Sequence, residues 1–239
     1  MLNYLKADFY RIFNKKSMYI TFVSFFVLYC LLVFIQSSSL TAKSIIDQAD
    51  YVFMFLAILG GGYLFATIYN EDLTAKSLPS IIGFGIKRTT IIISKIIVNI
   101  IMTAILFVLG YVALHLVFRA LGFNIDGNSN IAVIKTAVSY LLRLWAYGTI
   151  ASIVVYGTQK ATMSIVAFVL LVTGFVGQIL FLLLNQFKEM LDLTKFTIIP
   201  IVFNLIEKPI IVNMLAYLIY VIVFVVLSII AFRSKDLEF

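Results

Sequence analysis

The chain has 239 residues, of which 63% are hydrophobic and only 12% are charged, and its mean hydropathy is +1.10. This leaves too little polar material to cover a water-soluble globule of that size, so the excess apolar surface must face lipid. The apolar runs are continuous, which argues against a transmembrane β-barrel with its alternating strands. The formal net charge of +7 would suit nucleic acid or anionic lipid, so its distribution along the chain decides its meaning.

The first sixteen residues predict an amphipathic helix that lies on the membrane surface. Apolar residues, among them Phe9 and Phe13, recur at spacings of three and four, and the basic Lys6 and Arg11 flank this stripe. An apolar stripe with basic flanks is typical of interfacial helices. A secretory signal is the alternative, but the next apolar run is too long for a signal core and lacks a small-residue cleavage site.

Six apolar runs are long enough to cross a hydrocarbon core of about 30 Å, which requires about 20 helical residues. They cover residues 17–36, 51–70, 89–118, 134–156, 161–187 and 210–232. We therefore expect an all-α membrane protein with one six-span transmembrane domain, residues 17–232. A short tail, residues 233–239, follows the last span.

The basic residues predict which side of the membrane holds the chain ends. An even number of spans places both termini on one side, and the segments on that side carry a net charge of +6, whereas the opposite segments carry 0. Basic residues collect in cytoplasmic loops, so both termini are expected in the cytoplasm. The net charge is then a topology signal, and nucleic-acid binding is not needed to explain it.

Three consecutive glycines, Gly60, Gly61 and Gly62, interrupt the second span. They remove side chains over almost one helical turn, which favours close approach of another helix, such as one of a second subunit, over a hinge.

The loop at residues 71–90, predicted to be cytoplasmic, is the most informative segment outside the spans. Its opening acids, Glu71 and Asp72, favour a helix N-terminus, and Pro79 and Gly83 break it into short pieces. Such a loop is either a docking lever for a moving partner or an ordinary solvated loop that follows the positive-inside rule.

The order of these features resembles the type-2 permeases of ABC exporters: a basic amphipathic helix, six spans, a Glu-led loop after span two and a short basic tail. The matching residues are Glu71, Thr74, Lys76, Ser77, Gly83, Arg88 and Lys95 in and after the loop, and Phe232 to Leu237 in the tail. The resemblance implies that the N-terminal helix and the loop, including Asp72 and Lys87, receive a cytoplasmic ATPase subunit. It also implies that two permease subunits, identical or related, surround the translocation path. The small size and short outer loops are similar to the peptide-export or bacteriocin-immunity branch of Gram-positive bacteria.

Arg143 is a charged residue inside the fourth predicted span. A charge at that depth is costly unless it snorkels to the interface, pairs or faces a cavity, so either snorkelling or contact with an amphipathic or anionic cargo explains it. The spans contain no central carboxylate, which argues against a proton-coupled secondary transporter.

Three further features are weaker. Residues 188–209 stay apolar around Pro200 and form either a re-entrant broken helix or a surface-lying piece. Cys30 and His115 are the sole residues of their types, so a disulfide or a metal site within the chain has no support.

These observations favour a permease that moves an amphipathic peptide or other lipophilic cargo outward through a bacterial cytoplasmic membrane. The chain has no phosphate-binding glycine loop, so we expect ATP and Mg²⁺ on a separate ATPase, no cofactor on this chain and no enzymatic activity of its own. The alternatives are a non-transporting assembly or sensor subunit and, less favoured, a secondary transporter.

Overall fold

The computed structural model describes residues 2–36, 42–75, 77–123, 125–186, 195 and 197–235, with side chains except at 32–36 and 42–45. The described residues contain helices and turns but no strand. Four helical stretches are long and apolar enough to cross a membrane, and a bent pair makes a fifth if it counts as one span. The four are Ile46–Thr74, Arg88–Ala120, Gly127–Thr158 and Ile211–Ser234. The chain therefore has the helices of a membrane protein.

The first two helices meet at a turn. α1 (Leu2–Phe13) buries Asp8 and Ile12 and is followed directly by α2 (Lys16–Gln36). α2 occupies the first predicted span, but its side chains are described only as far as Leu31, and this part ranks among the shorter apolar helices.

The second span is one continuous helix that contains two π-helical segments. It consists of α3 (Ala42–Phe55), the π-helical η2 (Leu56–Gly60), α4 (Gly61–Phe65), the π-helical η3 (Ala66–Asn70) and α5 (Glu71–Thr74). π-Helical turns within α-helices are rare and occur often at functional sites. Here the second of them ends directly before Glu71 and Asp72, so it positions both carboxylates.

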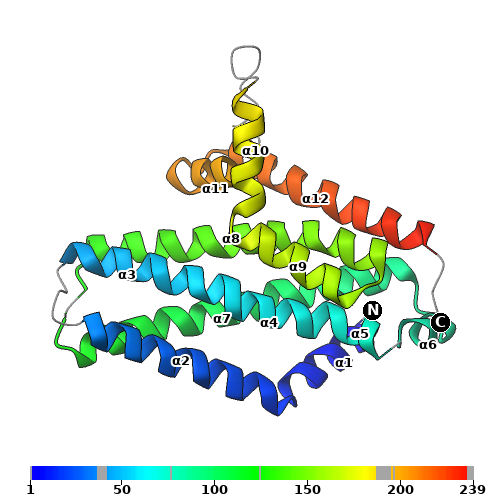
Figure 1. Ribbon diagram of the computed structural model, residues 1–239, viewed down its shortest axis with the longest axis horizontal. Helices are drawn as coiled ribbons and strands as arrows, with labels where there is room; N and C mark the ends of the chain where they lie inside the picture. Colours follow the sequence, from blue (N-terminus) through cyan, green and yellow to red (C-terminus); the bar gives the residue numbers. More distant parts are fainter. Residues whose placement is uncertain are drawn as a thin grey trace.

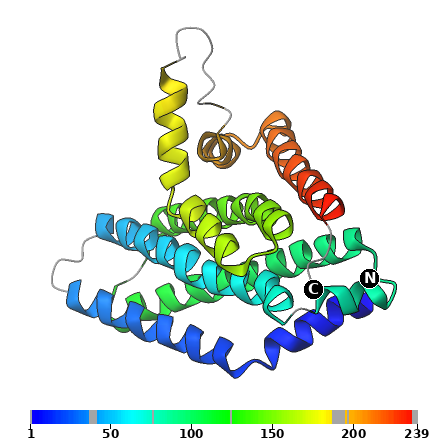
Figure 2. The ribbon, with the colours of Figure 1, turned by 45° about the vertical axis from the view of Figure 1, so that its right-hand side comes forward.

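α7 (Arg88–Ala120) and α8 (Gly127–Thr158) form the centre of the bundle. α8 packs against α3, α7, α9, α11 and α12, and α7 also packs against α1 and α2. The short α6 (Leu78–Gly83) precedes α7. α1, α5, α6 and the end of α12 (Ile211–Ser234) lie at the same end of the bundle (Figures 1 and 2).

The predicted fifth span is not one straight helix. α9 (Ala161–Val172) and α10 (Phe175–Asn185) meet at an angle of 61°. Gly174 at the break has a φ of +79°, a left-handed conformation that glycine adopts without steric cost. α10 stands away from the bundle and buries none of its residues (Figures 1 and 2).

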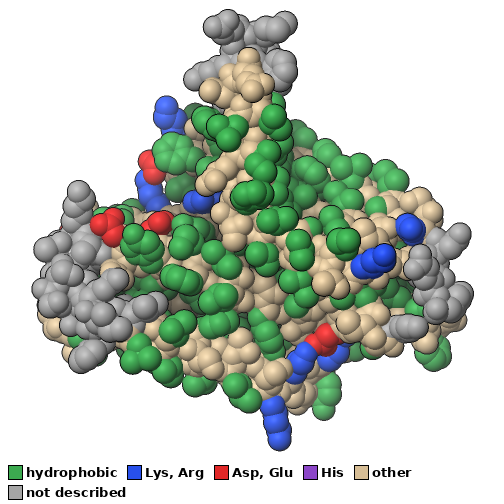
Figure 3. Space-filling model, in the orientation of Figure 1, with side chains coloured by type: hydrophobic (Ala, Val, Ile, Leu, Met, Phe, Trp, Pro, Cys, Tyr) green, Lys and Arg blue, Asp and Glu red, His purple; other side chains and the backbone are tan. Residues whose placement is uncertain are grey.

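Within segment 188–209, predicted to be either a re-entrant broken helix or a surface-lying piece, the structure places α11 (Ile198–Glu207), with Pro200 in its first turn. α11 packs against α8 and α12, and most of the segment before it lies outside the described residues. α12 buries only Tyr217, Ser228 and Phe232. Hydrophobic side chains are spread over the face seen in Figure 3, and the charged side chains visible there are confined to a few groups, as on a lipid-facing surface.

Candidate functional site

A group of charged side chains, three of them buried and three partly exposed, joins α1, α5 and α7. We call it the charge cluster. Its members are Asp8, Arg11, Lys15, Glu71, Asp72 and Lys95.

Lys95 of α7 is the centre of the charge cluster. Its Nζ lies 3.0 Å from Asp8 Oδ1 and 2.6 Å from Asp72 Oδ2, and its side chain is only 2% exposed. The two carboxylates are each 7% exposed. One lysine therefore connects the first helix to the end of the second span.

Arg11 of α1 and Lys15, in the turn after α1, complete the connection. Arg11 Nη1 lies 2.7 Å from Asp72 Oδ1 and its Nη2 lies 3.2 Å from Asp8 Oδ1. The Arg11 Nε is 3.7 Å from Glu71 Oε2, and Lys15 also pairs with Glu71. The charge cluster holds three carboxylates and three cations, so its formal charge is zero.

Tyr4 of α1 covers the charge cluster. Its hydroxyl donates a hydrogen bond to Asp72 Oδ2 at 3.5 Å, and the Lys95 ammonium lies 5.6 Å from its ring centroid. Burial, together with the charges of Asp72 and Asp8, raises the pKa of the Tyr4 phenol well above its usual value. The phenol therefore stays protonated and remains a donor.

The charge cluster fixes the position of α1 more than it adds stability. Removing an ion from water costs several kcal/mol, and a buried pair recovers that cost only when its geometry is good. Displacing α1 would leave Asp72 and Lys95 without Arg11 and Asp8, their partners. α1, α5 and the start of α7 should consequently move together.

Among the loop residues predicted to contact an ATPase, two belong to the charge cluster and the other described ones do not. Glu71 and Asp72 belong to the charge cluster, and Asp72 is buried, so it is not free to contact a partner protein. Thr74 is exposed, and the Ser77 backbone N–H donates to the Asp72 carbonyl, which closes the turn after α5. Lys76 lies outside the described residues.

Arg88 ends the loop by holding the last turn of α12. Its Nη1 donates to the carbonyl oxygens of Phe232 at 2.6 Å and Lys235 at 2.8 Å, and its guanidinium lies 5.3 Å from the Phe232 ring centroid. A cation at this position satisfies terminal carbonyl groups and interacts favourably with the helix dipole. The preceding Lys87 is exposed.

Phe84 is a residue that the sequence pattern did not single out. α6 is anchored by the buried Leu78 and by Ile81 and Ile82, which pack against the core. Directly after α6, the Phe84 side chain is 87% exposed, more than any other exposed large hydrophobic side chain in the described residues. The sequence contains 22 phenylalanines, and no local pattern around Phe84 distinguishes it from the others.

The outer surface of α1 remains open beside this loop. Lys6 and Phe13 are exposed, and Phe9 stacks on Phe13 with ring centroids 6.4 Å apart. The helix thus turns Asp8, Arg11 and Ile12 inward and leaves Lys6, Tyr10 and Phe13 exposed.

The glycines of the second span lie against neighbouring helices of the same chain. A Cβ atom at Gly60 would lie 2.7 Å from Leu106 of α7, and one at Gly61 would lie 2.8 Å from Leu144 of α8. At Gly62 the nearest atom, on Phe168 of α9, is 3.9 Å away. The close approach described here is therefore within the chain.

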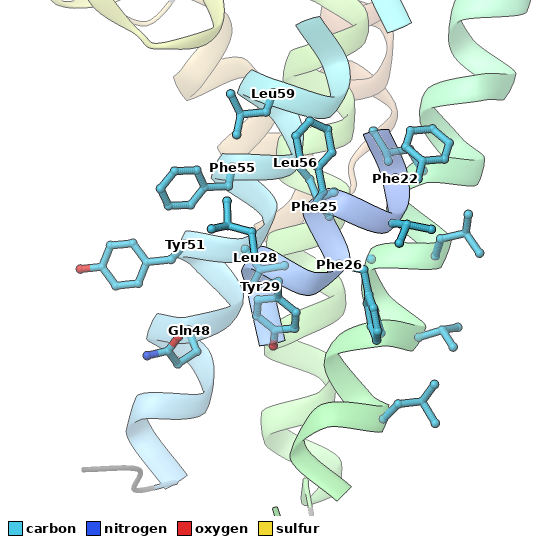
Figure 4. Close-up of a pocket in the computed structure, with 18 residues that line it drawn as sticks. Phe22, Phe25, Phe26, Leu28, Tyr29, Gln48, Tyr51, Phe55, Leu56 and Leu59 are labelled. Atoms are coloured by element: carbon cyan, nitrogen blue, oxygen red, sulfur yellow. The ribbon is translucent and has the colours of Figure 1, made fainter. Parts of the chain in front are cut away.

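A large apolar groove of about 520 Å³ separates α2 from the second span and α7. Aromatic side chains, among them Phe22, Phe26 and Phe55, line it, while Gln48 and Tyr51 lie toward the end where α3 begins (Figure 4). No charged side chain is among its described lining residues. The groove can hold a hydrocarbon chain but offers no ionic selectivity.

The remaining polar candidates lie apart from the charge cluster. Arg143 is in the middle of α8, and His115 contacts the Tyr111 ring and the Asn130 side chain. Cys30 is a free thiol. Within the described part of the chain, no group of three His, Cys, Asp or Glu side chains could hold a metal ion.

No protein-family model matches the chain, and no curated protein is significantly similar to it in sequence. The functional interpretation therefore depends on the charge cluster, the loop that follows it and the apolar surface of the bundle.

Proposed function

We propose that the chain is the membrane-spanning permease subunit of an ATP-driven exporter in a bacterial cytoplasmic membrane, with both termini in the cytoplasm. The charge cluster is the observation that carries this proposal. It joins α1 and the segment that starts at Glu71 into one surface, although Lys15 and Glu71 are 56 positions apart in the chain. A surface built in this way can receive a force from a partner without coming apart.

The surface connects directly to three spans. Asp72 lies in the last turn of the second span, Lys95 lies two turns into α7, and Arg88 contacts the end of α12. In the proposed mechanism, ATP closes the dimer of a separate ATPase, which binds ATP and Mg²⁺ and presses on α1 and α6. The displacement then reaches these spans together, and the bundle admits an amphipathic peptide or another lipophilic cargo outward.

A second permease copy or a related permease completes the proposed path. α10 buries no residue and α12 buries three, so both offer apolar faces to a second subunit or to lipid. The energy is supplied by the ATPase, and the permease itself performs no bond chemistry.

Co-purification tests the proposal. The tagged chain is isolated from its native host, and the expected result is a stable complex with a cytoplasmic ATPase and transport that stops when ATP is depleted. A chain that never associates with an ATPase, and whose transport continues without ATP, would exclude this function and favour an assembly or sensor role.

The Phe84→Ala variant tests the docking surface. Phe84 directly follows α6 and is 87% exposed, and truncating an aromatic hot-spot residue of a protein interface costs about 2 kcal/mol or more. We expect at least about a tenfold loss of ATPase affinity, measured with the purified subunits. The matched control is Phe203→Ala on α11, where the side chain is 63% exposed, and this variant should bind normally. Equal binding by both variants would exclude Phe84 as an anchor.

A further inference from the structure

A cavity of about 210 Å³ lies where the second span, α8 and the break between α9 and α10 meet. Its lining is mostly apolar and includes Met54, Ile58 and Val172. The polar exceptions include Tyr140, Tyr147 and Arg143 of α8. This cavity is separate from the charge cluster, because it lies near the middle of the bundle.

Arg143 is too deep in α8 to reach either end of that helix. It follows the first residue of α8 by 16 positions and precedes the last by 15, which places it about 24 Å from the first residue and about 22 Å from the last. Its guanidinium extends back only one turn, where Nη2 and Nε donate to Ser139 Oγ at 2.6 and 3.2 Å. The guanidinium is partly exposed and lies at the level of the cavity, which it lines.

No described carboxylate forms an ion pair with Arg143. Its guanidinium carbon lies 4.6 Å from the Tyr140 ring centroid, and the Asp50 carboxylate of α3 interacts with the Tyr140 hydroxyl instead. A guanidinium has five N–H groups, of which Ser139 accepts two. A cation inside the membrane whose N–H groups lack acceptors is energetically costly unless an anion pairs with it.

We propose that this cavity binds the anionic group of an amphipath that enters from the membrane, with Arg143 as its counter-ion. Phosphate and carboxylate groups both match the planar fork of a guanidinium. The apolar walls suit the first carbons of an attached chain, and the cavity volume suits a head group and not a whole lipid. Binding at Arg143 requires no ATPase, so this inference stands or falls separately from the proposed export function.

Native mass spectrometry of the purified full chain in detergent tests the proposal. The probes are phosphatidylglycerol and phosphatidylcholine with identical acyl chains. We expect the wild-type chain to retain phosphatidylglycerol at least about tenfold better, and Arg143→Gln to lose this preference. The matched control is Lys135→Gln, which removes an exposed cation of the same helix and should keep the preference. Equal retention of both lipids by the wild-type chain, or an unchanged preference in Arg143→Gln, would overturn the proposal.

Two further arms identify the source and protect the test against misfolding. Retention of oleate in place of phosphatidylglycerol would support a single-chain amphipath, whereas competition by inorganic phosphate at equal strength would overturn the requirement for a chain. Asp50→Asn removes an exposed negative charge beside Tyr140 and should increase the preference for the anionic lipid. An unchanged or smaller preference in this variant would overturn the proposal even if Arg143→Gln does not fold.

Discussion

Lys95 shows how one residue can join three helices. It lies on α7, pairs with Asp8 of α1 and Asp72 of α5, and is almost fully buried. A buried ion is tolerated only because its partners are present, so each member of the charge cluster offsets the desolvation cost of the others. Removing the Lys95 ammonium should therefore destabilise the fold much more than removing an exposed lysine.

We expect Lys95→Met to lower the free energy of unfolding by about 3–5 kcal/mol, because it leaves Asp8 and Asp72 as buried carboxylates with Arg11 as their shared cation. Denaturant titration of the purified chain in detergent measures the loss. The control is Lys135→Met, whose ion pair with Glu207 is about half exposed and should contribute about 0–1 kcal/mol. Similar losses of unfolding free energy in both variants would contradict a stabilising role of the charge cluster.

At the scale of elements, the second span determines how closely the helices of the bundle pack. Gly60 and Gly61 lie against leucines of α7 and α8, whereas the adjacent Gly62 has room for a methyl group. Interiors are packed too densely to absorb an extra carbon without displacement. Neighbouring glycines should therefore respond differently to the same substitution.

Gly61→Ala should destabilise the chain by about 1–2 kcal/mol, because its Cβ would lie 2.8 and 3.0 Å from the two Leu144 methyl carbons. Gly62→Ala should be neutral or stabilising by about 0.5 kcal/mol, since alanine favours a helix and the nearest atom is 3.9 Å away. Thermal unfolding of the two variants in the same detergent makes the comparison. Equal midpoints would contradict the packing described for this span.

At the scale of the whole molecule, the arrangement of the charged residues predicts sidedness. The end that holds α1, α5, α6 and the end of α12 is the end predicted to be cytoplasmic. The turn between α7 and α8 lies at the other end of both helices.

Cysteine labelling tests this orientation. In a Cys30→Ala background, we expect Asp126→Cys to react with a membrane-impermeant maleimide in intact cells. Lys235→Cys should react only after the membrane is permeabilised. Labelling of Lys235→Cys in intact cells would contradict the prediction that the termini are cytoplasmic.

The sequence by itself determined the helical class, the apolar runs and the amphipathic character of the first helix. Hydrophobic length and periodicity are local properties of the sequence. For this reason α7, α8 and α12 begin and end within a few residues of the predicted spans. The exception is the start of α8, which lies seven residues before the predicted one. The break at Gly174 was missed because one glycine in an apolar run has no distinctive pattern until its φ is known.

Only the tertiary structure decided which charges meet. Asp8, Asp72 and Lys95 are separated by 64 and 23 positions in the chain, and no local pattern indicates that they form one buried group. Helix packing brings them together, because the pairing of charges depends on three-dimensional distance and on the loss of water around them. For the same reason, the loop carboxylate Asp72 turned out to be buried, whereas the unremarked Phe84 turned out to be exposed.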